Sequence, residues 1–288
     1  MFLTPQDYFS RCGARPRKRL GQHFLTQPNT AEKIVREAEL EKSDVVVEIG
    51  PGLGALTRFV VGGIRSLHLV ELDRELAQHL DATLNSSGVS AEVHCSDAMD
   101  FDFLSLSRFE ETPLVVLGNL PYNISSPLVF RLLESSMAVK RAVFMVQREV
   151  GERFAAPPGS KDYGVLSVLL GIYARVTKLF SVGPDQFYPP PKVESIVVRM
   201  DFPPELACLD PPFDYMRRFV SVAFQQRRKT LHNSLRCLAG DMDLLDSAFE
   251  SADIDPRRRP ETLAPADFLR LGATLRTLMS VAVARVGC

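Results

Sequence analysis

The sequence predicts an α/β protein in which a mostly parallel sheet, with helices on both faces, precedes a small all-α C-terminal domain. Short apolar runs alternate with helix-like segments between residues 44 and 150, which is typical of parallel sheets covered by helices. After residue 205 the strand signals end, and apolar residues recur at helical spacings. We expect an arm over residues 1–28, a main domain over 29–204 and a helical domain over 205–288.

Each expected element follows from its local pattern. Residues 11–19 carry five basic residues and no acid, with a glycine and a proline among them, and predict an irregular arm. Apolar runs bounded by glycine, proline or acids predict buried strands at 44–50, 66–72, 91–97, 113–119 and 139–147, and helices near 54–61, 73–84 and 125–135. The runs 171–182 and 192–202 predict an antiparallel edge of the sheet. The expected apolar positions of the last domain are Met216, Phe219, Val220, Ala223, Leu231, Leu235 and Leu238.

Composition limits the possible functions. The 288 residues are 45% hydrophobic, enough for a full core, and 34 basic against 35 acidic side chains give a net charge of -1. Bulk positive charge therefore cannot hold nucleic acid or membrane, and such a partner would need a local patch. Five scattered cysteines form neither a disulfide framework nor a C-x-x-C site. The longest nearly apolar run, 164–174, is shorter than the roughly 18 residues that span a bilayer, so we expect no membrane partner. Together with the unpaired cysteines, this favours a location in the cytoplasm. We also expect a monomer.

A glycine-rich turn, Gly50-Pro51-Gly52-Leu53-Gly54, follows the first expected strand. In a first β-α unit, glycines let the backbone approach a nucleotide, and the start of the helix offers free N–H groups. The pattern is weak evidence by itself. An ordinary tight turn fits about as well, and with Ala55 the string also satisfies the looser dinucleotide motif G-x-G-x-x-A.

Two acids strengthen the case for an adenosine site. Glu71 ends the next strand, 21 residues after Gly50, where a carboxylate can accept both ribose hydroxyls. Asp97 ends the third strand and could accept a hydrogen bond from an adenine amino group. The alternatives are a solvated strand-end acid for Glu71 and a helix cap before Ala98 for Asp97. Together the three strand ends predict an adenosine pocket without specifying the cofactor.

The most informative tetrapeptide is Asn119-Leu120-Pro121-Tyr122, at the end of the fourth strand. It resembles the (D/N/S)-P-P-(Y/F/W) signature of S-adenosylmethionine-dependent methyltransferases that act on exocyclic amino groups, in the N-L-P-Y form of ribosomal RNA adenine dimethyltransferases. An adenine amino nitrogen is a poor nucleophile because its lone pair is delocalised into the ring. The Asn119 side-chain oxygen and the Leu120 carbonyl would each accept one amino hydrogen, with Pro121 fixing the turn and Tyr122 stacking on the base. Alone, the tetrapeptide would be read as an ordinary turn.

The resemblance to this family covers most of the chain. Residues 19–25, RLGQHFL, are similar to the family segment G-Q-(N/H)-F-L, which closes over the methionine end of the cofactor. Without the resemblance, His23 would be an ordinary surface histidine. The resemblance implies a Rossmann-like class I methyltransferase sheet and S-adenosylmethionine as cofactor. No metal is expected, since the sequence has neither H-E-x-x-H nor clustered His and Cys ligands. The implied cofactor contacts are His23, Leu25, Gly50, Gly52, Glu71, Asp97 and Asn119.

Two later segments extend the resemblance. Residues 161–168 look like the family's K-D-Y-G-x-L-S-V segment, to which we assign a structural role. Residues 187–195 resemble its F-x-P-x-P-x-V-x-S loop, whose leading aromatic flanks the target base. Phe187 and Tyr122 would then sandwich a splayed adenine and complete a catalytic set of Asn119, Leu120, Pro121, Tyr122 and Phe187. By composition alone the loop is a stiff proline linker, and Phe187 is a core anchor.

A basic stretch predicts the RNA surface. Residues 215–240 contain six basic residues and no acid, and a continuous helix would place residues eleven apart on one face. The alternative is a solvated face balanced by six acids between 241 and 255. The segment 226–235 also resembles the family's R-R-K-T-L-x-N-x-L, which favours RNA. With the arm, the expected RNA contacts are Arg17, Lys18, Arg19, Arg217, Arg218, Arg227, Arg228 and Lys229.

The sequence therefore favours one function over two rivals. We expect transfer of methyl groups to two adjacent adenosines near the 3′ end of small-subunit (16S) ribosomal RNA, each dimethylated at N6, in a precursor of the small subunit. One rival is a large-subunit ribosomal RNA adenine methylase. The other is a non-catalytic ribosome-assembly factor on a methyltransferase scaffold.

Overall fold

The computed structural model describes residues 2–88, 90–226 and 229–286, and the chain divides into two compact units. The first comprises Met1–Gly151 and Val176–Phe202, and the second comprises Glu152–Arg175 and Pro203–Cys288. This division differs from the contiguous ranges 1–28, 29–204 and 205–288 expected from the sequence. The N-terminal residues belong to the first unit, and residues 152–175 cluster with the C-terminal helices.

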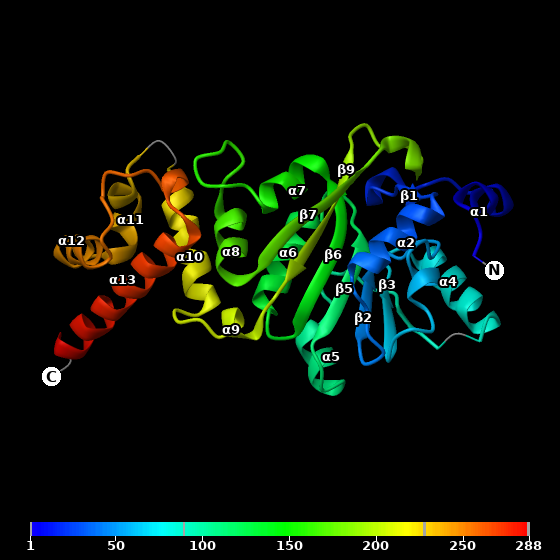
Figure 1. Ribbon diagram of the computed structural model, residues 1–288, viewed down its shortest axis with the longest axis horizontal. Coiled ribbons are helices and arrows are strands. Elements are labelled where there is room, and N and C mark those ends of the chain that lie inside the picture. The colour runs from blue at the N-terminus through cyan, green and yellow to red at the C-terminus, as the bar shows by residue number, and fades with distance from the viewer. Residues whose placement is uncertain (1, 89, 227–228, 287–288) are drawn as a thin grey trace. The chain divides into compact units, whose positions relative to one another are not determined.

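The first unit is built on a seven-stranded sheet with the order β4-β3-β2-β5-β6-β9-β7 (Figure 1). The strands are β2 (Val45–Ile49), β3 (Ser66–Val70), β4 (Glu92–His94), β5 (Leu114–Asn119), β6 (Val139–Gln147), β7 (Arg175–Val182) and β9 (Ser195–Asp201). Strands β2 to β6 are parallel, and β9 is antiparallel to β6, which confirms the predicted fold class. The chain winds from β2 towards β4 and then from β5 in the opposite direction. Open α/β sheets bind ligands at such a switch point, beside the carboxyl ends of the strands.

Helices cover the sheet and bury its strands. They are α2 (Pro28–Glu37), α3 (Thr57–Val60), α4 (Arg74–Ser86), α5 (Phe103–Phe109), α6 (Ser125–Glu134) and α7 (Arg148–Phe154). All five residues of β2 are buried, which explains its nearly continuous apolar composition. Ile34 of α2 and Leu80 of α4 join Val46 of β2 in one hydrophobic core, so both helices are held against the sheet by their apolar faces.

The N-terminal segment packs against the rest of the first unit, and of the irregular stretch expected at 11–19 only residues 13–17 lie outside a helix or 3₁₀ turn. Helix α1 (Pro5–Cys12) is capped by the Thr4 hydroxyl, and its Tyr8 and Phe9 are buried in a cluster with Phe24 and Leu53. A short 3₁₀ turn, Lys18–Leu20, follows. Strand β1 (Phe24–Leu25) then pairs antiparallel with β8 (Phe187–Tyr188). The aromatic residues of α1 supply the apolar contacts that a purely basic arm would lack.

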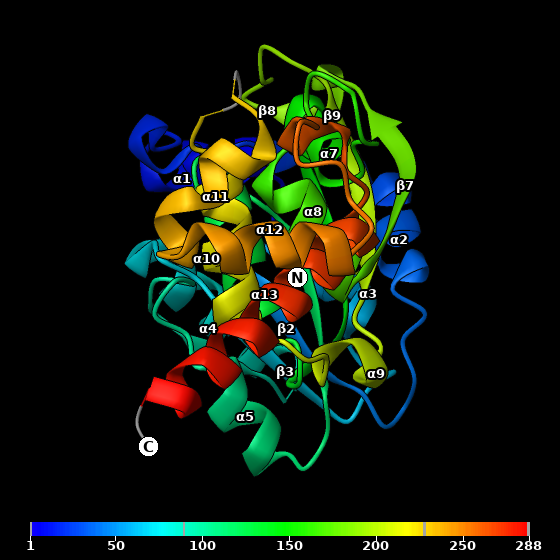
Figure 2. The ribbon, with the colours of Figure 1, turned by 90° about the vertical axis from the view of Figure 1, so that its left-hand side faces the viewer.

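The second unit is helical, as the periodicity predicts (Figure 2). Its helices are α8 (Val165–Tyr173), α9 (Pro204–Ala207), α10 (Phe213–Phe224), α11 (Leu231–Ala239), α12 (Met242–Ser251) and α13 (Pro265–Val286). The expected core positions of α10 and α11 are buried, except for partly buried Leu238. The Tyr163 hydroxyl donates a hydrogen bond to the Leu263 carbonyl at 2.8 Å. The K-D-Y-G segment thus has a structural contact within this unit.

One expected strand begins later than predicted. Residues 171–173 belong to helix α8, and β7 begins only at Arg175. Helix α8 is buried almost all round, because Leu166, Val168 and Leu169 are each at most 6% exposed. A short continuous apolar run has no periodicity that distinguishes a buried helix from a buried strand, and this accounts for the error.

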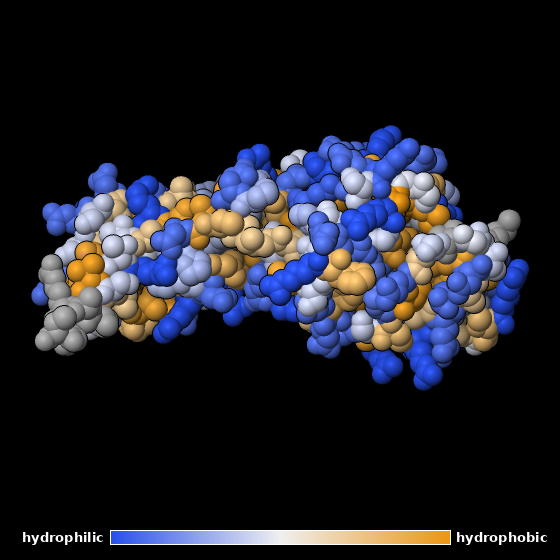
Figure 3. Space-filling view, turned by 90° about the horizontal axis from the view of Figure 1, so that it is seen from below, coloured by the Kyte–Doolittle hydropathy of each residue, from blue (hydrophilic) through white to orange (hydrophobic). Residues whose placement is uncertain are grey.

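The surface mixes polar and apolar residues. On the face shown in Figure 3, hydrophobic residues are interspersed with hydrophilic ones. Within the described residues, no helix combines the length and the apolar character needed to cross a membrane.

Candidate active site

A cavity of about 500 Å³ lies in the first unit where the parallel strands end. Its volume falls in the range typical of small-molecule sites. Its walls come from the glycine turn after β2, the residues after β3, β4 and β5, and the segments 2–6 and 20–27. The expected site residues that line it are His23, Leu25, Gly50, Gly52, Glu71, Asp97, Asn119, Leu120, Pro121 and Tyr122. The structure thus brings together every predicted cofactor residue.

The glycine turn allows a close approach of the backbone to this cavity. Gly50 and Gly52 have φ angles of +63° and +57°, a region that L side chains rarely adopt. A Cβ at Gly52 would also lie 3.1 Å from the Phe24 ring. The expected helix after the turn is shorter than predicted, since α3 covers only Thr57–Val60. The turn itself, rather than a long helix start, forms this wall.

Glu71 is held in place by backbone amides. Its Oε2 accepts a hydrogen bond from Gly52 N at 3.0 Å, and its Oε1 accepts one from Asp73 N at 2.8 Å. The residue is 7% exposed. Burial raises the pKa of its carboxyl, and the two N–H donors oppose that rise by stabilising the carboxylate. Each oxygen keeps a further lone pair, so Glu71 can accept hydrogen bonds from a ligand in the cavity.

A second carboxyl, Glu48, was not singled out in the sequence. It lies on β2 at 2% exposure, lines the same cavity and accepts a hydrogen bond from the Thr57 hydroxyl at 2.7 Å. Burial raises its pKa to about 7, and the nearby Glu71 adds to the rise. Its sequence signal is an acid inside an otherwise apolar strand, VVVEI, because a buried carboxyl of this kind needs a local partner.

Asp97 lies just beyond β4, and its Oδ1 accepts a hydrogen bond from Met99 N at 2.9 Å. It therefore caps the turn that follows and also lines the cavity. No helix begins at Ala98, so the alternative of a helix cap is replaced by the cap of a turn, and the remaining lone pairs of the carboxylate can still accept from a ligand.

Asn119 is oriented by the segment that crosses the cavity. Its Nδ2 donates a hydrogen bond to the His23 carbonyl oxygen at 2.8 Å. A carbonyl only accepts, so this bond fixes which end of the amide is Nδ2 and leaves Oδ1 as a free acceptor. The His23 ring in turn donates from Nδ1 to the Pro189 carbonyl at 2.7 Å.

The aromatic residues differ from the expected arrangement. Tyr122 lies at the cavity, where burial raises the pKa of its phenol. The ring stacked on it is His23, with centroids 5.6 Å apart and planes at 27°. Phe187 is 5% exposed, pairs with Leu25 and belongs to the hydrophobic core. In this structure Phe187 is therefore a core residue beside the site rather than a wall of the cavity.

The expected RNA residues fall into three groups. Arg17 forms two ion pairs within the first unit: its Nη1 is 3.1 Å from Oδ1 of Asp73, and its Nη2 is 2.9 Å from Oε1 of Glu75. Arg19 is exposed. The side chain of Lys18 and all of Arg227 and Arg228 lie outside the described residues. Arg217, Arg218 and Lys229 are exposed in the second unit.

The expectation of one continuous basic helix face is wrong. Helix α10 ends at Phe224, and α11 begins at Leu231 after the Thr230 cap. Residues eleven apart across this break do not share a helix face. The threonine is a strong N-cap signal, and it marks the start of a new helix inside the basic stretch.

Comparisons with known proteins agree with the geometry of the site. The model of the family described as ribosomal RNA adenine dimethylase matches residues 13–276. The ribosomal RNA small subunit methyltransferase A of Nitrosococcus oceani is 45% identical over 261 residues, covering 90% of this chain and 96% of its own. The protein of the same name from Chromobacterium violaceum is 43% identical over 256 residues, covering 89% and 94%.

Two solved structures resemble most of the chain. A dimethyladenosine transferase from Plasmodium falciparum has a TM-score of 0.76 at 27% identity, covering 86% of this chain and 96% of its own. The 23S rRNA methyltransferase ErmE has a TM-score of 0.67 at 25% identity, covering 88% and 99%. With the cavity at the carboxyl ends of the strands and the oriented Asn119, these matches show that the chain belongs to the ribosomal RNA adenine dimethylase family of methyltransferases.

Proposed function

We propose that the protein transfers methyl groups from S-adenosylmethionine to the N6 amino groups of two adjacent adenosines near the 3′ end of small-subunit ribosomal RNA. The substrate is a precursor of the small subunit, on which the protein acts as a monomer in the cytoplasm. The observation that carries this proposal is the hydrogen bond from Asn119 to the His23 carbonyl, which leaves Oδ1 as an acceptor at the cavity. The names of the relatives at 43–45% identity support the small subunit as substrate.

The residues of the cavity fit an adenosine-containing cofactor. Glu71 offers a buried carboxylate for the ribose hydroxyls, and Asp97 offers a carboxylate for the adenine amino group. Gly50 and Gly52 leave room for the backbone to approach the ligand, and His23 and Leu25 lie on the crossing segment. S-adenosylmethionine, when bound, supplies an electrophilic methyl group on a sulfonium.

The residues after β5 would prepare the amino group for attack. Oδ1 of Asn119 and the main-chain carbonyl of Leu120 accept the two amino hydrogens, which draws the lone pair out of conjugation with the ring. Tyr122 holds the base by stacking, so that catalysis depends on positioning and on hydrogen bonds that strengthen as charge develops on nitrogen. The exposed Arg217, Arg218 and Lys229 would contact phosphates of the RNA.

The test compares three substrates with labelled S-adenosylmethionine: unmodified small subunits, large subunits and free small-subunit RNA. We expect dimethyladenosine in digests of small-subunit RNA, identified by mass. Label in large-subunit RNA would instead support the large-subunit methylase. Binding to small subunits without any transfer would support the non-catalytic assembly factor.

A further inference from the structure

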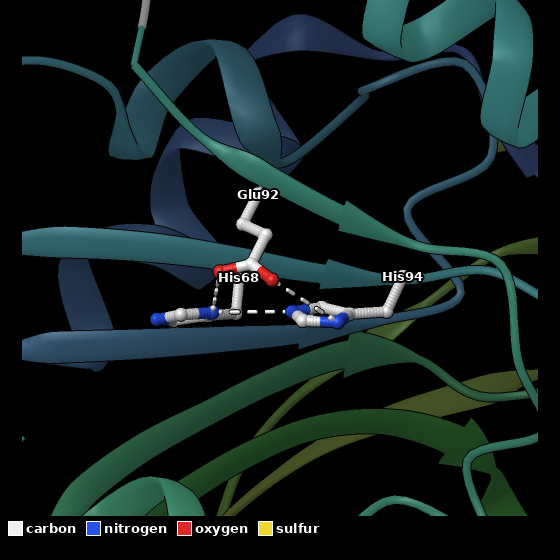
Figure 4. A group of neighbouring side chains, drawn as sticks. All are labelled: His68, Glu92 and His94. Carbon is white, nitrogen blue, oxygen red and sulfur yellow. Dashed lines mark hydrogen bonds and ion pairs between the residues drawn. The ribbon is translucent and has the colours of Figure 1, made fainter. Parts of the chain in front are cut away.

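Three side chains gather on one face of the sheet, apart from the cavity. His68 lies on β3, and Glu92 and His94 lie on the adjacent edge strand β4 (Figure 4). The parallel register pairs His68 with Glu92 and Val70 with His94, so all three side chains project from the same face. They do not line the methyl-transfer cavity. No local pattern in the sequence indicates this cluster, because the two histidines are 26 positions apart in the chain.

The spacing of the ligand atoms matches a transition-metal site. Nδ1 of His68 is 3.1 Å from Nε2 of His94 and 3.5 Å from Oε2 of Glu92. Ligands at 2.0–2.1 Å from a tetrahedral zinc ion lie about 3.3 Å from one another. One ligand atom from each residue lies within 4.8 Å of the others, so a single ion can reach all three after small side-chain rotations.

A carboxylate lies behind the His68 ring. Oε1 of Glu110 is 3.5 Å from Nε2 of His68, on the side away from the cluster. Glu110 is itself held by Arg65 at 3.4 Å and by the Ser66 hydroxyl at 3.2 Å. Nε2 of His68 is buried without a hydrogen-bond partner, so a small side-chain rotation would bring its N–H to the Glu110 carboxylate. Carboxylates behind metal-binding histidines accept this N–H and leave the other ring nitrogen for the ion.

The cluster combines a buried base with an open entrance. The side chains of His68, His94 and Glu92 are 7%, 25% and 66% exposed. An ion from solvent would therefore reach the cluster on the side of the Glu92 carboxylate. The two rings are nearly parallel, at 22°.

We propose that Nδ1 of His68, one ring nitrogen of His94 and the Glu92 carboxylate bind one Zn²⁺ ion, with water in the fourth position. The ion ties the edge strand β4 to β3. Because Asp97 follows β4 by only three residues, the ion also holds the strand that leads into the cavity. This site is structural and independent of the proposed methyl transfer.

The experiment titrates metal-free protein with Zn²⁺ against a chelating indicator and, in parallel, with Co²⁺ followed by visible absorption. We expect binding of one ion per chain and the intense Co²⁺ bands of a four-coordinate site. Glu92→Gln and His94→Asn change exposed or partly exposed side chains and should fold. Each should weaken Zn²⁺ binding by at least about tenfold.

Two matched variants test specificity. His232→Asn removes a histidine that pairs with Asp246 in the second unit, and Cys95→Ser removes the exposed thiol next to His94. Both should bind Zn²⁺ like the unaltered protein. Zn²⁺ should also raise the melting temperature of the unaltered protein but not of Glu92→Gln. Absence of saturable binding, or binding by Glu92→Gln and His94→Asn as tight as that of the unaltered protein, would overturn the proposal and leave the cluster as a network of ion pairs.

Discussion

Asn119 and His23 lie 96 residues apart in the chain and are joined by a hydrogen bond from Nδ2 to a main-chain carbonyl. The bond links the end of β5 to the segment that crosses the cavity. It determines which end of the Asn119 amide carries the hydrogens, because Nδ2 donates to the carbonyl and Oδ1 keeps its capacity as an acceptor. Asn119 also lines the cavity, so the proposed role of Oδ1 as an acceptor for an amino group can be tested directly.

Replacing Asn119 with Ala tests this arrangement. Loss of the acceptor should lower the rate of methyl transfer by roughly 100-fold or more, as for other groups that stabilise developing charge. The measurement is transfer of labelled methyl to small subunits, with circular dichroism to check folding. Asn85→Ala, an exposed change on α4, serves as the control and should be neutral. Near wild-type transfer by Asn119→Ala would remove this residue from the chemistry.

Tyr122 should act through its ring. Tyr122→Ala should reduce kcat/KM about 10- to 100-fold, since stacking on a base contributes roughly 1–3 kcal/mol. Tyr122→Phe keeps the ring and should retain most of the activity. Single-turnover assays of both variants on small subunits make the comparison. Equal losses in the two variants would assign the effect to the hydroxyl and contradict a stacking role.

Glu48 predicts a pH dependence of stability. Its folded pKa of about 7 is raised above the ordinary value of 4.5. The folded state therefore binds the proton more tightly, and the resulting stabilisation is full below the unfolded pKa and is lost as pH rises through about 7. The free energy of unfolding should fall by on the order of 3 kcal/mol between the low-pH and high-pH limits of this titration.

Glu48→Gln isolates this effect, because its amide oxygen can still accept from Thr57 while the side chain no longer titrates. Urea unfolding between pH 5 and pH 8 should show a steeper loss of stability with pH for the unaltered protein than for Glu48→Gln. Parallel curves for the two proteins would mean that Glu48 does not titrate in this range.

The basic residues of the second unit should contribute to RNA affinity without affecting chemistry. Changing Arg218 and Lys229 to Glu should weaken binding and reduce the slope of log K against log salt by about one for each lost phosphate contact. Filter binding to small-subunit RNA at several salt concentrations measures both quantities. Arg257→Glu, in the same unit, makes the same kind of charge reversal at a residue paired with Asp255. If Arg257→Glu weakened RNA binding as much as the changes at Arg218 and Lys229, the loss of affinity would reflect the net charge of the protein rather than contacts made by these two residues.

The strands, and the residues that line the cavity at the strand ends, could be predicted because their signals are local. Runs such as VVVEI and LVVLGN identify β2 and β5, and parallel strands place their carboxyl ends, with Gly50, Glu71, Asp97 and Asn119, at one edge of the sheet. The α/β fold class follows from these patterns, whereas the contributions of His23 and Leu25 to the cavity wall were expected only from the family resemblance.

The features that the sequence did not predict depend on contacts between residues that are distant in the chain. Tyr8 and Phe9 find their apolar partners on Phe24 and Leu53, so the N-terminal segment packs although its sequence is basic. Phe187 pairs with Leu25 in the core, and no local pattern reveals which side of the loop it faces. Glu48 could have been noticed as an acid in an apolar strand. The approach of His68 to His94 depends on the register of two strands, which the sequence does not display.

The pairing of β1 with β8 joins two segments that the sequence analysis treated separately. Besides the ladder, Thr26 donates from its backbone N–H and its hydroxyl to the Gln186 carbonyl, and His23 donates to the Pro189 carbonyl. Residues 23–26 and the proline-rich loop are therefore tied together by one set of hydrogen bonds and cannot move independently. Substitutions at Leu25 and Phe187, which face each other in the ladder, should be strongly non-additive in a double-mutant cycle, so a change on either segment should alter the other.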